Sequence, residues 1–144
     1  MAETVSDSID VAAPAAEVFA VATDFEAYPQ WNESVEKVEV RAADDDGRAT
    51  IVWFEVDARV RVVRYTLAYD YSNAPRAFSW DLVDGDVAAL RGSYEFDELD
   101  GVTEVRYELS VDPGFPLPAF LRRQASRQIA RAALADLKRR VESA

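Results

Sequence analysis

The last stretch of the chain constrains the fold more than any other. Residues 113–118, Pro-Gly-Phe-Pro-Leu-Pro, lead into residues 119–143, which contain neither glycine nor proline. Alanine, leucine, arginine, lysine and glutamine dominate this run, and all are strong helix formers. The prolines ahead of it suit a helix start, where the missing N–H breaks no hydrogen bond. We therefore expect one terminal helix of about 25 residues, roughly 37 Å from end to end.

The apolar residues of this helix change face along its length. At about 100° per residue, the second half has one face that should pack on a sheet: Ala130, Ala133, Leu134, Leu137 and Val141. The first half groups another set about half a turn away: Leu117, Phe120, Leu121, Gln124, Ala125 and Gln128. Two interpretations stay open. The helix bends near residues 128–129 or contacts another loop, or it seals the sheet at one end and roofs a cavity at the other.

Almost everything before residue 113 has the pattern of β-strands. Residues 4–11 alternate apolar and polar side chains, as a half-buried strand does. Pro14 opens a short helix over residues 15–23, and Thr23-Asp24 can cap a second short helix that Pro29 limits. Six further strands follow, separated by short turns. Many strands followed by one long helix indicate an α+β fold with a seven-stranded antiparallel sheet curved around that helix.

Turn lengths predict how these strands pair. A two-residue loop at Asp100-Gly101, a strong hairpin signal, pairs Leu99 with Val102 and therefore Tyr94 with Tyr107. Further along, a three-residue loop over residues 84–86 would place Trp80 opposite Leu90. A four-residue loop over residues 72–75 would place Tyr69 opposite Phe78 and Leu67 opposite Trp80.

These registers put apolar side chains opposite one another, as a sheet with one buried face requires. The expected inward set is Val63, Tyr65, Leu67, Tyr69, Phe78, Trp80, Leu82, Leu90, Tyr94, Phe96, Val105, Tyr107, Leu109 and Val111. Residues 49–57 are apolar on both faces. A two-residue turn after them points Val52, Phe54 and Val56 inward, which we prefer, whereas a three-residue turn selects Ile51 and Trp53.

Composition excludes several kinds of chemistry. The chain has no histidine and no cysteine, which removes a histidine base, a thiol nucleophile, disulfides and the usual zinc sites. The net charge of −11 argues against nucleic acid as a partner. The five glycines form no phosphate loop, and Asp44-Asp45-Asp46 lacks the ligand spacing of a calcium loop. We expect no metal and no cofactor.

The same composition suggests how the protein is organised and where it acts. We expect one domain over residues 1–144, in the cytoplasm, as a monomer or homodimer, because no segment resembles a signal peptide or a membrane span. Seven basic residues lie on the last helix: Arg122, Arg123, Arg127, Arg131, Lys138, Arg139 and Arg140. These residues either solvate the outer face of the helix or attract it weakly to an anionic membrane. Transient contact with a membrane is therefore one interpretation, and we expect no stable insertion.

Several local motifs resemble a known superfamily over essentially the full length. They are residues 28–31 with 35–40, residues 78–85, residues 90–94, and residues 113–118 with 121–123. The chain is similar to the START-like, helix-grip (SRPBCC) superfamily, and most to its small bacterial polyketide cyclase/dehydrase-like and coenzyme Q-binding-like members. The resemblance implies a helix-grip fold with two short helices after the first strand. It also implies a cavity between sheet and helix.

The residues leave an aromatic inner wall as the candidate site. Rings that carry a hydroxyl or indole N–H suit planar apolar ligands, because each offers area and one polar contact. The expected ligand-binding residues are Phe54, Tyr65, Tyr69, Trp80, Tyr94, Tyr107, Phe120 and Arg123. A filled core of rings packing on each other is the alternative.

Two functions remain open for such a wall. The first is binding or transport of a hydrophobic small molecule, namely a lipid, a quinone or a polyketide. The second is a polyketide cyclase/dehydrase, or aromatase, acting on a poly-β-keto chain. That chemistry needs a proton donor and acceptor. Tyrosines, Glu55, Asp57 or an arginine would have to serve, although Glu55 and Asp57 face inward only in the register we do not prefer, and no catalytic residue is assigned.

Overall fold

A computed structural model gives the fold, and it describes residues 3–58 and 61–143. The order of elements is β1 (Glu3–Val11), α1 (Ala15–Ala22), the 3-10 helix η1 (Phe25–Ala27), α2 (Tyr28–Trp31), β2 (Val35–Ala43), β3 (Ala49–Asp57), β4 (Val62–Asp70), β5 (Ala77–Gly85), β6 (Ala89–Leu99), β7 (Val102–Asp112) and α3 (Ala119–Glu142). This is the expected α+β helix-grip architecture. None of the described helices is both long and apolar enough to cross a membrane.

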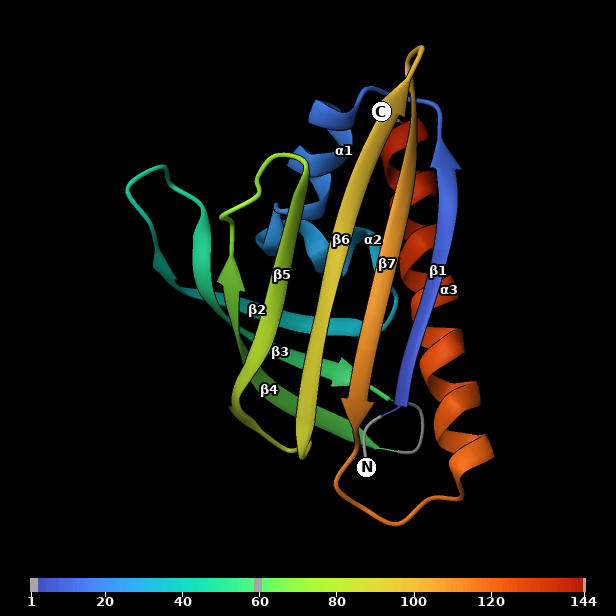
Figure 1. Cartoon of the computed structure of the whole chain (residues 1–144). Helices are drawn as coiled ribbons and strands as arrows, with labels where there is room; N and C mark the ends of the chain where they lie inside the picture. Colours follow the sequence, from blue (N-terminus) through green and yellow to red (C-terminus); the bar gives the residue numbers. More distant parts are fainter. Residues whose placement is uncertain (1–2, 59–60, 144) are drawn as a thin grey trace.

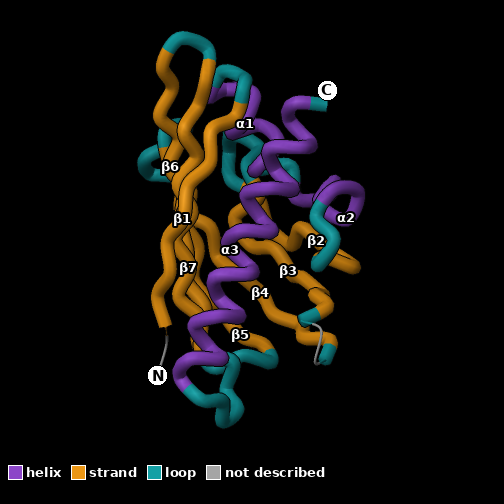
Figure 2. The backbone as a smooth tube through the Cα atoms, turned by 90° about the vertical axis from the view of Figure 1, so that its right-hand side faces the viewer, coloured by secondary structure: helices purple, strands orange, loops and turns teal. Residues whose placement is uncertain are grey.

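The seven strands form one antiparallel sheet in the order β1-β7-β6-β5-β4-β3-β2. The sheet curves strongly, so that β2, β3 and β4 run across the direction of β6 and β7 (Figure 1). Helix α3 lies along the concave side, where it packs mainly on β1 and β7 and on α1 (Figure 2). Helices α1 and α2 cover the other end of the same side. The concave face therefore holds the core.

One expected register is confirmed at the β6–β7 hairpin. Leu99 pairs with Val102, and Tyr94 pairs with Tyr107. The loop between them has Asp100 at φ 54° and Gly101 at φ 82°. Both central residues thus have the positive φ that a tight two-residue hairpin turn requires, and glycine adopts it without strain.

The expected register between β5 and β6 is wrong by two residues. Trp80 lies opposite Gly92 rather than Leu90. A Cβ built on Gly92 would lie 2.4 Å from Cζ2 of Trp80, so only glycine leaves room for the indole ring here. In the observed register the large side chain of Trp80 therefore lies opposite glycine, which has no side chain. A shift of two residues keeps every side chain on its own face of the sheet.

The expected register between β4 and β5 is also wrong by two residues. Tyr69 lies opposite Trp80, and Leu67 lies opposite Leu82, with an irregularity between Thr66 and Leu67. The turn is longer than expected, because β4 ends at Asp70 and β5 begins only at Ala77. All members of the inward set are nevertheless buried or half-buried. Alternate residues of a strand point to opposite faces of the sheet, and both register differences are of two residues, so each side chain keeps its expected face.

Strand β3 adopts the preferred register. Val52 and Phe54 are buried and Val56 is half-buried on the concave side, where all three pack against the core. The backbone N–H of Ala58 donates to the carbonyl of Arg61 at 3.0 Å, consistent with a two-residue turn after β3. The two residues of that turn lie outside the described ranges.

The second short helix differs in detail from the expectation. Pro29 stands in the first turn of α2 rather than at its end. Proline is favoured there because its missing N–H has no partner in the first turn of a helix. Asp24 precedes η1 but makes no side-chain capping hydrogen bond, so the expected cap is absent.

Helix α3 runs unbroken over 24 residues. Its second half buries Ala130, Leu134, Leu137 and Val141, with Ala133 half-buried, as the sequence pattern predicts. In the first half the side of the helix that the sequence grouped separately is exposed: Phe120, Leu121, Gln124, Ala125 and Gln128. Only Arg122 and Ser126 are shielded there.

Candidate ligand-binding site

The concave face of the sheet carries one continuous network of aromatic rings. Tyr94 and Tyr107 lie with ring centroids 4.9 Å apart, and Trp80 contacts both at 5.6 and 5.8 Å. Tyr69 joins Trp80 at 5.9 Å, and Phe54 joins Tyr65 at 5.7 Å. These separations and tilted geometries fall in the range where aromatic pairs stabilise one another. Six of the eight expected ligand-binding residues are thus brought onto one wall.

The network extends beyond the residues that strand parity singled out. Phe25 bridges the strands and the short helices, with its ring 4.5 Å from Tyr69 and 6.2 Å from Phe54. Tyr28 lies 5.2 Å from Phe25 and 4.8 Å from Trp31. The helical spacing of Phe25, Tyr28 and Trp31 marks a cluster in the sequence. Its position over the sheet depends on the chain path after β1, which spacing alone does not give.

The other two expected residues stand apart from this wall. Phe120 is 65% exposed, and Arg123 is exposed as well, both on the first half of α3. Within the described ranges, Phe120 has no ring contact with the aromatic network. Their part in ligand binding stays a prediction, as does that of the six wall residues.

The tyrosine hydroxyls of the wall fall into two groups. Tyr28 donates to the carbonyl of Ala22, and Tyr71 donates to the carbonyl of Ala49 at 2.6 Å. The second group has no hydrogen-bond partner among residues 3–58 and 61–143: Tyr65, Tyr69, Tyr94 and Tyr107. None of these four oxygens is sealed from water, although the rings that carry them are buried or half-buried. They therefore face space that a water molecule, or a ligand atom, can enter.

Burial keeps these hydroxyls neutral. It is the main cause that raises the pKa of Tyr65, Tyr69, Tyr94 and Tyr107 well above the ordinary tyrosine value. The hydroxyls also raise one another's pKa, because ionising one would place its charge near the next. Each remains an O–H donor at physiological pH.

One end of the concave face is less well covered than the other. Four inward side chains there are only half-buried: Tyr65, Leu82, Leu90 and Val111. Loops frame this end in Figure 1, with the turn after β5 near the segment that joins β7 to α3. The N–H of Ala88 donates to the carbonyl of Asp112 at 2.9 Å. The guanidinium of Arg61 lies 4.5 Å from the ring centroid of Phe115. These contacts make the segment around Phe115 a rim shared by three loops.

The carboxylates that could have served as bases lie elsewhere. Glu55 points to the convex side, where its carboxylate accepts from Nε of Arg64 at 2.9 Å. Asp57 is exposed at the end of β3. Asp136 is a buried carboxylate on α3; it pairs with Arg139 at 2.6 Å and contributes to the raised pKa of Tyr94. No group of three or more carboxylates that could hold a metal ion occurs in the described part of the chain.

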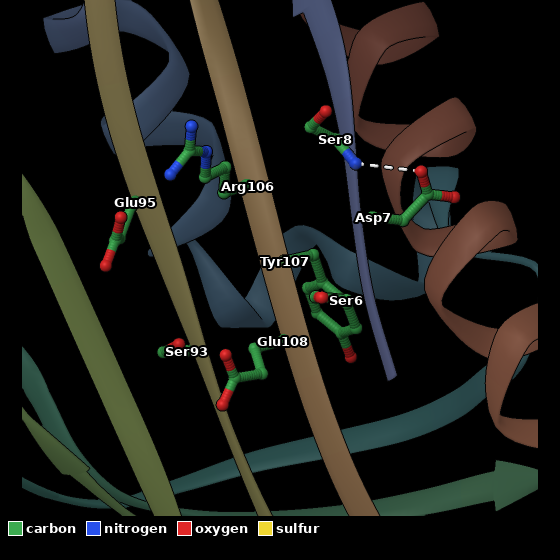
Figure 3. A pocket seen from close by; sticks show the side chains of 8 residues that line it. All are labelled: Ser6, Asp7, Ser8, Ser93, Glu95, Arg106, Tyr107 and Glu108. Atoms are coloured by element: carbon green, nitrogen blue, oxygen red, sulfur yellow. Dashed lines mark hydrogen bonds between the residues drawn. The ribbon is translucent and has the colours of Figure 1, made fainter. Parts of the chain in front are cut away.

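Two hollows lie outside the aromatic wall. The larger, of about 460 Å³, is on the convex face over β1, β7 and β6 and is lined by Ser6, Asp7, Ser8, Ser93, Glu95, Arg106, Tyr107 and Glu108. Figure 3 shows its charged side chains spread over the outer face of the strands. The smaller, of about 190 Å³, lies among α1, α2 and α3. The convex hollow is lined mainly by polar and charged side chains, unlike a site for an apolar molecule.

A family model described as polyketide cyclase/dehydrase and lipid transport matches residues 2–142. The chain belongs to this family. It is therefore a START-like, SRPBCC protein, as the motifs of the sequence suggest. Members of the polyketide cyclase/dehydrase and lipid transport family bind hydrophobic ligands or act as polyketide cyclases. A comparison with curated proteins finds no match.

Solved structures agree with the family assignment. A START superfamily protein from Mycobacterium smegmatis is 25% identical, with a TM-score of 0.91 and 97% of each chain covered. The Zhui aromatase/cyclase from Streptomyces sp. R1128 is 20% identical, with a TM-score of 0.83, covering 99% of this chain and 94% of that one. A protein from Thermus thermophilus is 19% identical, with a TM-score of 0.83 and 98% of each chain covered. The last two identities establish a shared fold.

Proposed function

We propose that this protein binds a hydrophobic small molecule that carries carbonyl oxygens, such as a quinone, a polyketide or a lipid, between the sheet and α3. One observation carries the proposal. Four tyrosine hydroxyls, those of Tyr65, Tyr69, Tyr94 and Tyr107, end in water-accessible space with no partner in the described chain. A buried core that served stability alone would pair such hydroxyls, as Tyr28 and Tyr71 are paired.

The chemistry of the wall suits such a ligand. Neutral phenols donate to a carbonyl oxygen without the desolvation cost of a charged group. The surrounding rings offer flat apolar area to the rest of the molecule. Burial of roughly 300 Å² of ligand surface, at about 25 cal/mol per Å², gives a gross stabilisation near 7 kcal/mol. A free energy of about 7 kcal/mol corresponds to a dissociation constant near 10 µM, and the cost of association weakens binding further, so we expect a dissociation constant above about 10 µM.

Binding is favoured over cyclisation by the position of the carboxylates. A cyclase needs an acceptor for the proton removed from the poly-β-keto chain. Glu55 is held on the convex face by Arg64, and Asp57 is exposed at a strand end. The inner wall supplies phenols that their raised pKa keeps protonated, so almost none is present as the phenolate that could accept this proton.

The test compares two kinds of tyrosine. Affinity for a naphthoquinone is measured by fluorescence quenching for the parent and for the variants Tyr94→Phe and Tyr107→Phe. We expect each variant to bind about five- to tenfold more weakly, because one net hydrogen bond of about 1 kcal/mol or slightly more is lost. The matched control is Tyr71→Phe, whose hydroxyl is already occupied by Ala49. It should lose stability and keep its affinity.

Two outcomes would contradict the proposal. Equal losses of affinity in Tyr94→Phe and Tyr71→Phe would show that the effect comes from general destabilisation. Absence of any naphthoquinone or fatty-acid binding, together with no small molecule in native mass spectra of the purified protein, would show a filled core. Turnover of a poly-β-keto mimic that collapses in one tyrosine variant while affinity survives would favour the cyclase.

A further inference from the structure

The small hollow among the three α-helices has a lining unlike that of the aromatic wall. Its volume is about 190 Å³, and Figure 2 shows α1 and α2 beside the second half of α3, where it lies. None of the four tyrosines with unpartnered hydroxyls lines it, so it is separate from the ligand site proposed above. The hollow is lined by Ala20, Val21, Asp24, Ala27, Trp31 and Arg140.

The two charged residues of the hollow have opposite signs, and neither is neutralised. Asp24 lies between α1 and η1, and Arg140 lies near the end of α3. Among residues 3–58 and 61–143 neither has an ion-pair partner, and the two do not pair with each other. A carboxylate and a guanidinium therefore border one small space as separate charges.

Local hydrogen bonds hold both charged residues in place. The backbone N–H of Asp24 donates to the carbonyl of Val21 at 3.3 Å, and the backbone carbonyl of Asp24 accepts from the N–H of Ala27 at 3.2 Å. Nη2 of Arg140 donates to Oε1 of Gln30 at 3.0 Å. A guanidinium has five N–H donors in one plane, so this bond orients the group and leaves other donors for a carboxylate.

The rest of the lining is apolar. Trp31 is only 7% exposed, and its ring lies 4.8 Å from that of Tyr28, so the indole is a fixed wall. Small aliphatic side chains complete the lining and leave the space open: Ala20, Val21 and Ala27. At about 30 Å³ for each water molecule, the volume holds about six waters, which suits a molecule the size of one amino acid.

We propose that this hollow binds a free α-amino acid with an apolar side chain. The carboxylate of such a zwitterion pairs with Arg140, because the planar guanidinium matches a carboxylate. Its ammonium group pairs with Asp24, and its side chain lies against the indole of Trp31. A fatty acid or one end of a peptide offers only one of the two charges. The separate opposite charges therefore select the free amino acid.

The site does not depend on the hydrophobic ligand proposed above. Asp24 is exposed and Arg140 is half-buried, so water and salt weaken both charged contacts. The ligand is also small, which limits the area that it can bury. We therefore expect a dissociation constant of about 1 mM.

The experiment follows proton–nitrogen NMR spectra of the full chain during titration with L-leucine. We expect saturable shifts that are confined to the residues around the hollow. Two derivatives of leucine each lack one charge: N-acetylleucine lacks the ammonium group, and leucinamide lacks the carboxylate. Each should bind about tenfold more weakly than leucine, because one charged hydrogen-bonded contact is lost.

Two variants assign each charge of the ligand to its partner. Asp24→Asn should weaken leucine binding about tenfold, and this variant should then bind leucine and N-acetylleucine equally well. Arg140→Gln should show the same loss, with leucine and leucinamide bound equally well. The matched controls Glu26→Gln and Arg131→Gln remove the same charges at exposed positions outside the hollow. Both controls should bind leucine like the parent.

Four results would overturn the proposal. Equal binding of leucine and its two derivatives by the parent would show that the charges take no part. Equal weakening in the two control variants would show a general effect of charge. Weaker leucine binding in Tyr94→Phe, with binding unchanged in Asp24→Asn, would place leucine on the aromatic wall instead. The absence of any saturable shift would show that the two charges are only solvated.

Discussion

Raising the pH should unfold this protein sharply, because its interior holds neutral tyrosines. Burial raises the pKa of Tyr28, Tyr65, Tyr69, Tyr94 and Tyr107, and it raises the pKa of Tyr71 to about 12. In the unfolded chain a tyrosine ionises near pH 10. Above that pH the unfolded state releases protons that the folded state retains, so the free energy of unfolding falls as the pH rises.

The size of the effect follows from the number of buried rings. At pH 11 each of the five tyrosines whose pKa is raised furthest lowers the free energy of unfolding by about 1.4 kcal/mol. Together they remove about 7 kcal/mol, which is comparable to the whole stability of a domain of this size. Unfolding should therefore occur between about pH 10.5 and 11.5 at room temperature.

The assay follows tyrosinate absorbance and far-ultraviolet circular dichroism on the same samples. All six tyrosines of the chain have a raised pKa, so the folded protein should show almost no tyrosinate near pH 10. Both signals should then change in one transition. The variant Tyr94→Phe/Tyr107→Phe removes two titrating groups and should lose only about 4 kcal/mol at pH 11. Tyrosinate appearing near pH 10 with the dichroism intact would refute the reasoning.

Three further outcomes test the packing of the sheet and its rim. Gly92→Ala places a methyl group against the Trp80 indole and should cost about 1–3 kcal/mol in denaturant unfolding, with a changed tryptophan spectrum; an unchanged midpoint would contradict the register. Arg61→Ala removes the cation–π contact with Phe115 and should speed ligand release about two- to fivefold in stopped flow, and an unchanged rate would exclude a rim role. Glu55→Gln should leave naphthoquinone affinity within about twofold; a larger loss would place this carboxylate at the ligand.

Sequence reasoning predicts the faces of the strands better than their pairing. The inward set follows from alternation, which survives any even error in loop length, so Trp80 and Tyr69 face the core although both lie opposite unexpected partners. The exact register depends on which residue of β6 leaves space for the Trp80 ring. That residue is Gly92, which lies opposite Trp80 on the neighbouring strand. Turn length alone does not contain this information.

The candidate site could likewise be predicted only in part from the sequence. The rings of β4 to β7 are predictable because a strand has only two faces. Which hydroxyls are paired depends on the three-dimensional structure: the hydroxyl of Tyr71 donates to the carbonyl of Ala49 on the neighbouring strand β3, while that of Tyr69, two residues away, has no partner in the described chain. Phe120 is exposed because helical periodicity places it with the set about half a turn from the side of α3 that packs on the sheet.

The place of β1 in the sheet has a consequence for the order in which the chain can fold. Glu3 pairs with Val111, and Ile9 pairs with Val105, so β1 cannot join the sheet until β7 has been synthesised. Helix α3, which comes later still, packs mainly on that same first strand. During synthesis β1 therefore remains without either neighbour until more than a hundred residues have emerged. Contacts so distant in sequence close slowly, and until they do the apolar side of β1 is exposed to aggregation or to a chaperone.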